Sequence, residues 1–125
     1  MGMKKFINDP ENLTAELLDG YVKAYSNKVA LQNKKIVVRA EPKDTSKVAI
    51  VTLGGSGHEP ALSGFVGEGM LDISVVGDIF AAPGPPNVYE ALKTADRGAG
   101  ILLVVLNHEG DVMSANTAMD MAVSE

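Results

Sequence analysis

The sequence predicts an α/β fold, a three-layer sandwich with a mostly parallel sheet, in which residues 1–125 form a single domain. An apolar strand-like run, a loop and a helical pattern follow one another three times along the chain. The run at 101–106 is apolar throughout, which is typical of strands buried on both faces of a parallel sheet. In folds of this class, ligands bind where the carboxyl ends of the strands meet.

The first predicted element is a surface helix. Asp9 followed by Pro10 is typical of a helix start, with the acid as N-cap and proline at the first helical position. The apolar residues that follow share one helical face: Leu13, Leu17, Leu18, Tyr21, Val22 and Tyr25. Residues 29–39 contain short strand-like pieces, residues 41–44 read as a loop, and residues 47–53 form the first strong strand.

The remaining elements follow from apolar periodicity and from glycine and proline positions. Pro60 begins a short helix that Gly64 and Gly67 weaken. The prolines of residues 81–86 exclude that loop from a helix or a central strand. The expected elements are, in order, a helix at 60–69, a strand at 71–76, a loop at 81–86, a helix at 87–97, a strand at 101–106, a turn at 107–110 and a helix at 111–124.

Composition excludes several classes of function. The formal net charge of −5 disfavours nucleic acids and anionic membranes as partners, because both bind clustered Lys and Arg. The chain has no cysteine, which excludes disulfides, thiolate catalysis and cysteine zinc sites. Residues 1–10 hold no apolar run, and no stretch approaches the roughly 20 apolar residues of a membrane span. We therefore expect no signal peptide, no membrane contact and a cytoplasmic location.

The most informative segment is Gly54-Gly55-Ser56-Gly57-His58-Glu59-Pro60, directly after the strand at 47–53. Its glycines allow a tight turn that leaves backbone N–H groups free for a small polar ligand. His58 is one of two histidines, and imidazole is the side chain that exchanges a proton near neutral pH. We interpret the segment as a ligand-binding turn with an acid/base histidine. The competing interpretation is a tight strand–helix turn with an incidental exposed histidine.

Other chemistries fit this segment less well. A phosphate loop needs Lys and then Ser or Thr where His58 and Glu59 stand, and the dinucleotide motif needs glycine where Pro60 stands. A hydrolytic Ser56 beside His58 lacks a separate third member of a triad. His58-Glu59 and His108-Glu109 suit zinc or iron by residue type, but adjacent residues seldom reach one ion and the H-E-x-x-H spacing is absent.

A second polar segment, residues 107–111, follows the strand at 101–106. Asp111 is a candidate to accept hydrogen bonds from ligand hydroxyls or to hold His58 in one tautomer. The alternative is that Asp111 is the N-cap of the next helix, and the two roles can coexist. Asp78, after the strand at 71–76, is a further polar candidate, unless it only orders the loop at 81–86.

Five motifs together resemble the dihydroxyacetone-binding subunit of dihydroxyacetone kinase. They are MKKFINDP at 3–10, GGSGHEP at 54–60, GEGML at 67–71, GDIFAAP at 77–83 and NHEGD at 107–111. Because they occur in order along the whole chain, the resemblance is specific to this family. The fold it implies is the N-terminal part of that subunit.

The resemblance implies a glycerone kinase of glycerol metabolism, which phosphorylates a terminal hydroxyl of dihydroxyacetone. Gly55, Ser56, Gly57 and His58 fall on the family's substrate-binding loop, with His58 as its acid/base residue, and Asp111 falls on a substrate-contacting carboxylate. The resemblance implies no metal and no cofactor bound by this chain. The phosphoryl donor is expected on a partner, either an ADP-carrying subunit fed by the phosphotransferase system or an ATP-binding kinase domain. It also suggests a homo-oligomer, a dimer.

The chain departs from the family pattern in two ways. Family members commonly carry a lysine that touches substrate where this chain has Leu106. The family's subunit also continues for roughly 200 further residues, the size of a second domain, and that part carries a histidine that bonds covalently to the substrate carbonyl as a hemiaminal. Both departures keep an alternative open: a catalytically silent ketose-binding paralogue that acts as a regulator or coactivator.

Overall fold

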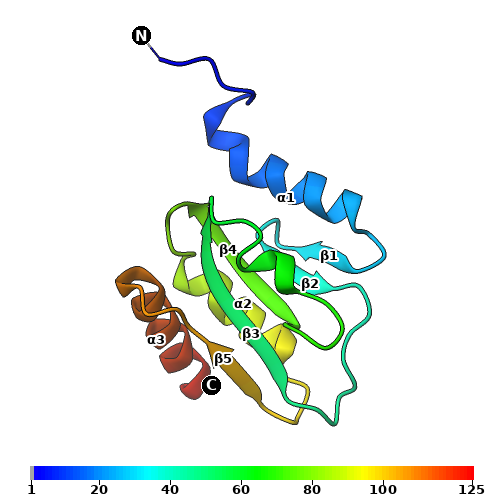
Figure 1. Cartoon of the computed structure of the whole chain (residues 1–125). Coiled ribbons are helices and arrows are strands. Elements are labelled where there is room, and N and C mark those ends of the chain that lie inside the picture. The colour runs from blue at the N-terminus through cyan, green and yellow to red at the C-terminus, as the bar shows by residue number, and fades with distance from the viewer. Residues whose placement is uncertain (1) are drawn as a thin grey trace.

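A computed structural model describes residues 2–125, so Met1 is the one residue of the predicted domain that lies outside the described part. A five-stranded sheet runs in the order β1-β2-β4-β3-β5 (Figure 1). The strands are β1 (Val29–Gln32), β2 (Ile36–Arg39), β3 (Ala49–Ser56), β4 (Ile73–Ile79) and β5 (Ile101–Val104). The helices are η1 (Pro10–Asn12), α1 (Leu13–Ala24), η2 (Ser63–Phe65), α2 (Pro85–Ala95) and α3 (Glu109–Val123).

The sheet is mixed. Strand β3 pairs in parallel with both β4 and β5, whereas β1 and β2 form an antiparallel hairpin that joins β4 in antiparallel sense. The predicted α/β class is confirmed, and the parallel part of the sheet is its centre and the β5 side. The three parallel strands are the three that the repeated strand–loop–helix pattern indicated.

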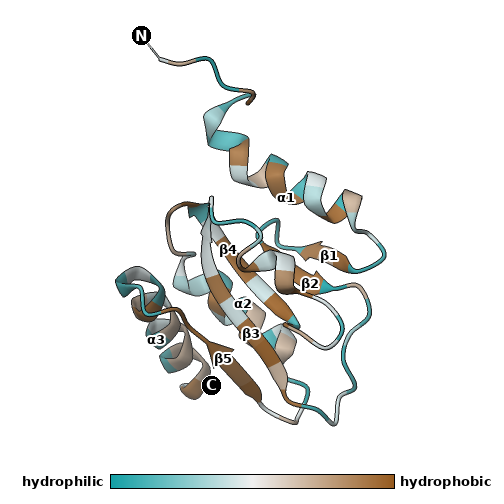
Figure 2. Cartoon of the chain, viewed as in Figure 1, coloured by the Kyte–Doolittle hydropathy of each residue, from teal (hydrophilic) through white to brown (hydrophobic). Residues whose placement is uncertain are grey.

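Two apolar cores make the three layers, one on each face of the sheet. On the first face α2 and α3 cover Val51, Leu53 and Val75, all fully buried. On the second face Leu18 of α1 packs with Val37 of β2. Figure 2 shows the alternation of apolar and polar residues along α1 and the apolar strands beneath it. Each fully buried aliphatic side chain contributes about 1.5–3 kcal/mol relative to an exposed one, so the two cores hold the layers together.

Strand β3 extends further than the sequence predicted. It ends at Ser56, whereas the prediction ended the strand at residue 53. Gly54 and Gly55 lie beside Val76 and Gly77 of β4 in the parallel ladder, with an irregularity before Ser56. Ladder hydrogen bonds thus outweigh the weak strand preference of glycine. The turn after β3 accordingly begins at Gly57.

The predicted helix at 60–69 is wrong. Only the 3-10 turn η2 forms, and Val66 leaves it with extended backbone to bridge Leu71. Val66 is buried in the second core, which a continuous helix would not allow. The two glycines of the segment lower the helix propensity further.

Of two helix starts, the sequence predicted that of η1 correctly and that of α2 incorrectly. Asp9 is the N-cap of η1, its carboxylate accepting a hydrogen bond from the Glu11 N–H at 2.9 Å, as predicted. The expectation that the prolines at 81–86 stay outside a helix is wrong, because α2 begins at Pro85 and its first turn includes Pro86. Proline fits there because the first N–H groups of a helix have no intrahelical acceptor.

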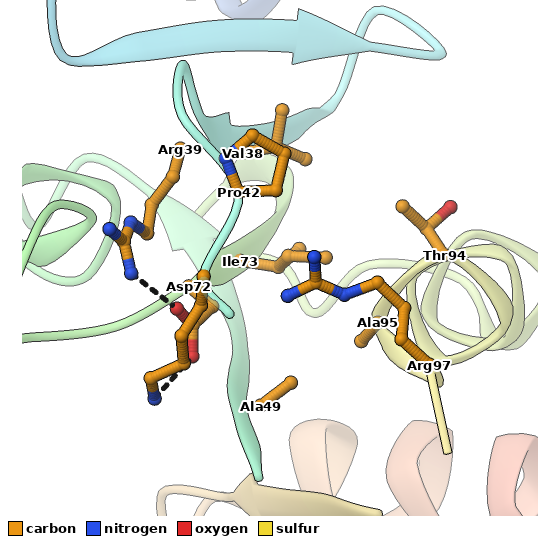
Figure 3. Close-up of a pocket in the computed structure, with 10 residues that line it drawn as sticks. Val38, Arg39, Pro42, Ala49, Asp72, Ile73, Thr94, Ala95 and Arg97 are labelled. Atoms are coloured by element: carbon orange, nitrogen blue, oxygen red, sulfur yellow. Dashed lines mark hydrogen bonds and ion pairs between the residues drawn. The ribbon is translucent and has the colours of Figure 1, made fainter. Parts of the chain in front are cut away.

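The carboxylate of Asp72, at the amino ends of β3 and β4, accepts hydrogen bonds from three segments: the end of β2, the loop that follows it and β3 (Figure 3). Its carboxylate accepts hydrogen bonds from Arg39 Nη1 at 3.1 Å, from Lys43 Nζ at 3.1 Å and from the Ile50 N–H at 2.7 Å. A cavity of about 170 Å³ lies beside this cluster, and the guanidinium of Arg97 points into it. Burial alone raises the Asp72 pKa, but the three hydrogen bonds outweigh it and leave the pKa below its ordinary value.

We expect Asp72→Asn to lower the free energy of unfolding by about 2 kcal/mol at pH 7, because two partly buried cations, Arg39 and Lys43, lose their counter-ion. A depressed pKa means that the contribution is complete above the ordinary carboxyl pKa of about 3.9. It is lost as the pH falls through the folded-state value. Urea denaturation at pH 7 and at pH 3 measures the difference, which should shrink at the lower pH.

Asp19→Asn, at the exposed pair with Lys23, is the control and should lower the free energy of unfolding by less than about 0.5 kcal/mol. Equal losses in the two variants would contradict the assignment.

Candidate functional site

A cavity of about 490 Å³ lies at the carboxyl ends of the parallel strands, within the size range of ligand pockets. Strand β3 contributes Gly54 and Gly55, the turn after it contributes His58, and the segment after β5 contributes His108 and Asp111. The glycine-rich segment and residues 107–111, which each follow a predicted strand, therefore line one cavity. The cavity and the Asp72 cluster lie at opposite ends of β3.

Ser56 and Gly57 belong to the same segment but do not line this cavity. The Ser56 side chain is buried, and its hydroxyl donates to the Gly77 carbonyl at 2.7 Å. The Gly57 N–H donates to both carboxylate oxygens of Glu59, at 3.0 and 3.2 Å. The expected free N–H is thus occupied by an acidic side chain of the same turn. The roles of Ser56 and Gly57 as substrate contacts stay predictions, and the bond from Ser56 to Gly77 gives no support to a hydrolytic serine.

The floor of the cavity is a close contact between β3, β4 and the loop that follows β4. A Cβ added at Gly55 would lie 2.7 Å from the Ala81 nitrogen and oxygen, and one at Gly77 would lie 2.0 Å from the Ala81 oxygen. Glycine is needed at both positions because the backbone of Ala81 occupies the space of a side chain. The glycines of this segment therefore have a packing role that sequence reasoning did not separate from ligand binding.

His58 is exposed at the mouth of the cavity and packs against Phe80. The two ring centroids are 5.0 Å apart at an angle of 56°. Phe80 has a φ of 51°, in the left-handed region that non-glycine residues seldom adopt, and its side chain lies over Gly57. This contact limits where the imidazole lies. Phe80 was missed by sequence reasoning, since nothing in the local pattern indicates its backbone conformation.

Asp111 lies in the first turn of α3, with only 7% of its surface exposed. The helix begins at Glu109 with His108 as its N-cap, so the alternative role of Asp111 as N-cap is wrong. No residue among 2–125 donates a hydrogen bond to its carboxylate. Burial raises the Asp111 pKa, while nearby His108 and His58 partly offset the rise through their positive charge. The carboxylate is therefore an acceptor held next to both histidines with its capacity unused.

Two further residues bear on the predicted chemistry. Leu106 lines the cavity, and about half of its surface is exposed. The carboxylate of Asp78 pairs with Lys35 Nζ at 2.7 Å, while its backbone carbonyl accepts the Ala81 N–H. Asp78 thus connects β4 to the β1–β2 hairpin and does not line the cavity.

Residues 2–125 hold no group of three or more His, Asp or Glu side chains arranged to bind a metal ion. Their helices are all too short or too polar to cross a membrane.

Comparison with known proteins identifies relatives across the chain. A family model described as the Dak1 domain matches residues 19–125. The dihydroxyacetone-binding subunit DhaK of the PTS-dependent dihydroxyacetone kinase of Lactococcus lactis is 48% identical over 126 residues. That alignment covers 100% of this chain and 38% of the relative, so the chain spans well under half of the relative's length.

Solved structures give the same fold. The dihydroxyacetone kinase from C. freundii, in complex with AMP-PNP and Mg²⁺, superposes with a TM-score of 0.89 at 35% identity, over 98% of this chain and 24% of that one. A dihydroxyacetone kinase operon co-activator, Dha-DhaQ, superposes with a TM-score of 0.82 at 33% identity, over 88% of this chain and 34% of that one. The α/β architecture is therefore shared by a kinase and by a co-activator.

We expect Gly55→Ala to destabilise the fold by about 1–3 kcal/mol, because its new methyl group would overlap the backbone of Ala81. Gly54→Ala is the matched control in the same strand. Its Cβ would meet only a side-chain carbon of Leu62 at the ordinary distance of 3.6 Å. Thermal unfolding of both variants measures the difference. A Gly55→Ala protein as stable as Gly54→Ala would show that the loop moves aside freely.

Proposed function

The chain belongs to the Dak1 domain family, and from that membership we propose that it is the substrate-binding portion of a dihydroxyacetone kinase. One observation of the site carries this proposal. The carboxylate of Asp111 and the imidazole of His58 line one cavity, and no residue among 2–125 donates a hydrogen bond to that carboxylate. An acceptor and a proton-exchanging group are what a small polyhydroxy substrate requires for phosphorylation.

The cavity suits an uncharged ketose of a few carbons. Asp111 accepts hydrogen bonds from substrate hydroxyls, and its low exposure, 7% of its surface, strengthens these bonds. Gly55 and Ala81, packed backbone to backbone, provide a rigid wall. Phosphoryl transfer depends mainly on positioning the reactants, so a rigid site is an advantage.

His58 is the proposed general base. As a terminal hydroxyl oxygen of the ketose attacks phosphorus, a new P–O bond forms and the bond from phosphorus to the donor's leaving oxygen breaks. The hydroxyl proton passes to His58. The donor is proposed to be on a partner, an ADP-carrying subunit or an ATP-binding domain, and the phosphotransferase system is the phosphate source that the L. lactis relative's name indicates for that protein.

Activity is proposed to need more than this chain. The chain spans 38% of the L. lactis subunit, so the rest of such a subunit is part of the proposed enzyme. The second histidine that binds the substrate carbonyl, expected from the family resemblance, would be supplied by that part. The working enzyme is then a complex of substrate-binding and phosphoryl-donor parts.

A ketose-binding regulator is the second candidate function. Leu106 places an apolar side chain in the cavity where the family commonly has lysine. One structural neighbour is a co-activator of the dihydroxyacetone kinase operon. A protein of this kind would bind the ketose and pass no phosphate to it.

The test combines dihydroxyacetone binding with phosphoryl transfer. Dihydroxyacetone should shift the backbone NMR signals of Gly55, His58 and Asp111 in the chain. Transfer is then measured after adding the part of the L. lactis subunit that the chain does not cover, together with that enzyme's phosphoryl donor. His58→Gln should lower the transfer rate at least 100-fold with little change in binding, as for loss of a general base. His108→Gln, at the same cavity, should cause a smaller loss.

The outcomes separate the candidates. Binding with no transfer in the complemented mixture would overturn the kinase proposal in favour of the regulator. No binding of dihydroxyacetone, alone or complemented, would overturn both.

Asp111→Asn gives a second, pH-dependent prediction. We expect its affinity for dihydroxyacetone to fall about tenfold or more at pH 7, since a hydrogen bond to a charged group contributes about 1.5–3 kcal/mol. In the unsubstituted protein the affinity should fall as the pH drops through the Asp111 pKa, at higher pH than for an ordinary aspartate.

The thermal stability of the Asp111→Asn protein is the control for this prediction. Burial disfavours the charged form, so Asp111→Asn should keep or raise the melting temperature at pH 7. Titration calorimetry from pH 4 to 8 measures the affinity. A pH dependence that is unchanged in the variant would show that Asp111 is not the acceptor.

A further inference from the structure

A second cavity, of about 170 Å³, lies at the opposite end of β3 from the candidate functional site. Its walls come from the end of β2, the starts of β3 and β4 and the last turn of α2 (Figure 3). None of the residues that line it lines the candidate functional site, and the proposed phosphoryl transfer does not use it. A ligand of this cavity is therefore separate from the ketose.

Positive charge gathers around this cavity, although the chain as a whole has a formal net charge of −5. Three cations line it: Arg39, Lys43 and Arg97. Among the described residues of its lining, Asp72 is the one acid. That carboxylate already accepts hydrogen bonds from Arg39 and Lys43, each at 3.1 Å. The lining therefore has an excess of two positive charges, which attracts an anion.

Arg97 is the cation of this group without a protein partner. Among residues 2–125, its guanidinium forms no ion pair and donates no hydrogen bond. Asp44 instead accepts hydrogen bonds from Ser46, which are the main cause of its lowered pKa, and the charge of Arg97 contributes least to that shift. The dipole of α2 favours a cation at this end of the helix but occupies none of the N–H groups. The planar set of N–H donors is thus available, and it points into the cavity (Figure 3).

Much of the remaining lining is apolar. Ala49, Ile73 and Ala95 lie on three different elements and are 3%, 5% and 5% exposed. An apolar group that covers such a wall is removed from water, which a small inorganic anion cannot achieve. An engineered apolar cavity of about 150 Å³ in another protein binds benzene. The space beside Arg97 therefore accommodates a body of about one aromatic ring.

We propose that this cavity binds a small organic carboxylate that carries one negative charge on an apolar body of about the size of one aromatic ring. Its carboxylate pairs with Arg97, whose planar fork suits the two oxygens of such a group. Its body lies against Ala49, Ile73 and Ala95. The Asp72 carboxylate repels the ligand little, because the two cations bonded to it outweigh its charge.

Benzoate is the probe for the first experiment, in which the chain is titrated and its NMR signals are followed. Saturable shifts are expected at the backbone amides of Ile73 and Ala95 and at the side-chain N–H of Arg97. The amides of Gly55 and His58, at the other end of the sheet, are the internal reference and should stay unchanged. The absence of saturable shifts at millimolar benzoate would overturn the proposal.

Two related molecules separate the contributions of charge and apolar contact. Benzamide keeps the ring without the charge, and acetate keeps the charge with almost no apolar body. Each should bind at least tenfold more weakly than benzoate. Acetate binding as tightly as benzoate would show a simple anion site, and benzamide binding as tightly would show an uncharged apolar site. Either result would overturn the proposed ligand class.

Matched variants test the role of Arg97. Arg97→Gln should weaken benzoate binding about tenfold or more, since it removes a charged hydrogen-bond donor. Arg97→Lys keeps the charge and should cause a smaller loss. Lys47→Gln is the control, because Lys47 is exposed near the start of β3 and does not line the cavity. Equal losses in Arg97→Gln and Lys47→Gln would show general attraction to positive charge and overturn the site.

The melting temperature distinguishes a binding role of Arg97 from a structural one. Benzoate should raise the melting temperature of the unsubstituted chain, because it binds the folded state, and should leave that of Arg97→Gln nearly unchanged. A variant that melts lower without ligand, yet is stabilised by benzoate as much as the unsubstituted chain, would show that Arg97 only supports the fold.

Competition with dihydroxyacetone keeps this test independent of the proposed function. Dihydroxyacetone should not displace benzoate, since the two cavities share no residue. Displacement would place benzoate in the candidate functional site and overturn the second site. Benzoate binding in a chain that binds no dihydroxyacetone would remove the proposed function and support the second site.

Discussion

The parallel pairing of β3 with β4 on one side and β5 on the other is the constraint on which the candidate site depends. Val51 lies beside Ile73 and Leu103 in this ladder, so all three strands leave the sheet at one edge. Val51 is fully buried under α2 and α3. A shift of one residue would turn it to the other face, and the cost of that exposure fixes the register. The core thereby determines that His58 and Asp111, more than 50 positions apart in the sequence, line one cavity.

The same edge combines tight packing with an unfavourable charge. Gly55 and Gly77 let the Ala81 backbone lie directly on the strands, which makes the floor of the cavity rigid. Asp111 lies beside the cavity with 7% of its surface exposed and no donor among residues 2–125, and burial raises its pKa. Partial burial of a charged group lowers stability, and such violations of local rules concentrate at functional sites. The rigid floor and a carboxylate without a protein donor together describe a site prepared for a ligand that brings its own donors.

Sequence patterns revealed the fold class and the polar ends of the strands, but not the details that tertiary contacts decide. Gly54 and Gly55 resemble a loop by composition, yet pairing with β4 keeps them in β3. Asp111 is a favoured N-cap residue, yet α3 begins earlier, at Glu109. The position of Phe80 over Gly57 depends on a backbone conformation that no local pattern encodes. Each miss concerns a choice between locally similar alternatives that is made by a partner distant in the sequence.

Leu106 is the residue that bears most directly on the choice between the two candidate functions. It lies just beyond the end of β5 and presents an apolar side chain to the cavity, where the family resemblance predicts a lysine. A kinase needs groups that hold the ketose and stabilise charge during transfer. An apolar side chain supplies neither, so a kinase would need another group for that role. A regulator has no such requirement, since binding alone is enough for its action. The two candidate functions therefore differ in what they require of the residues around Leu106.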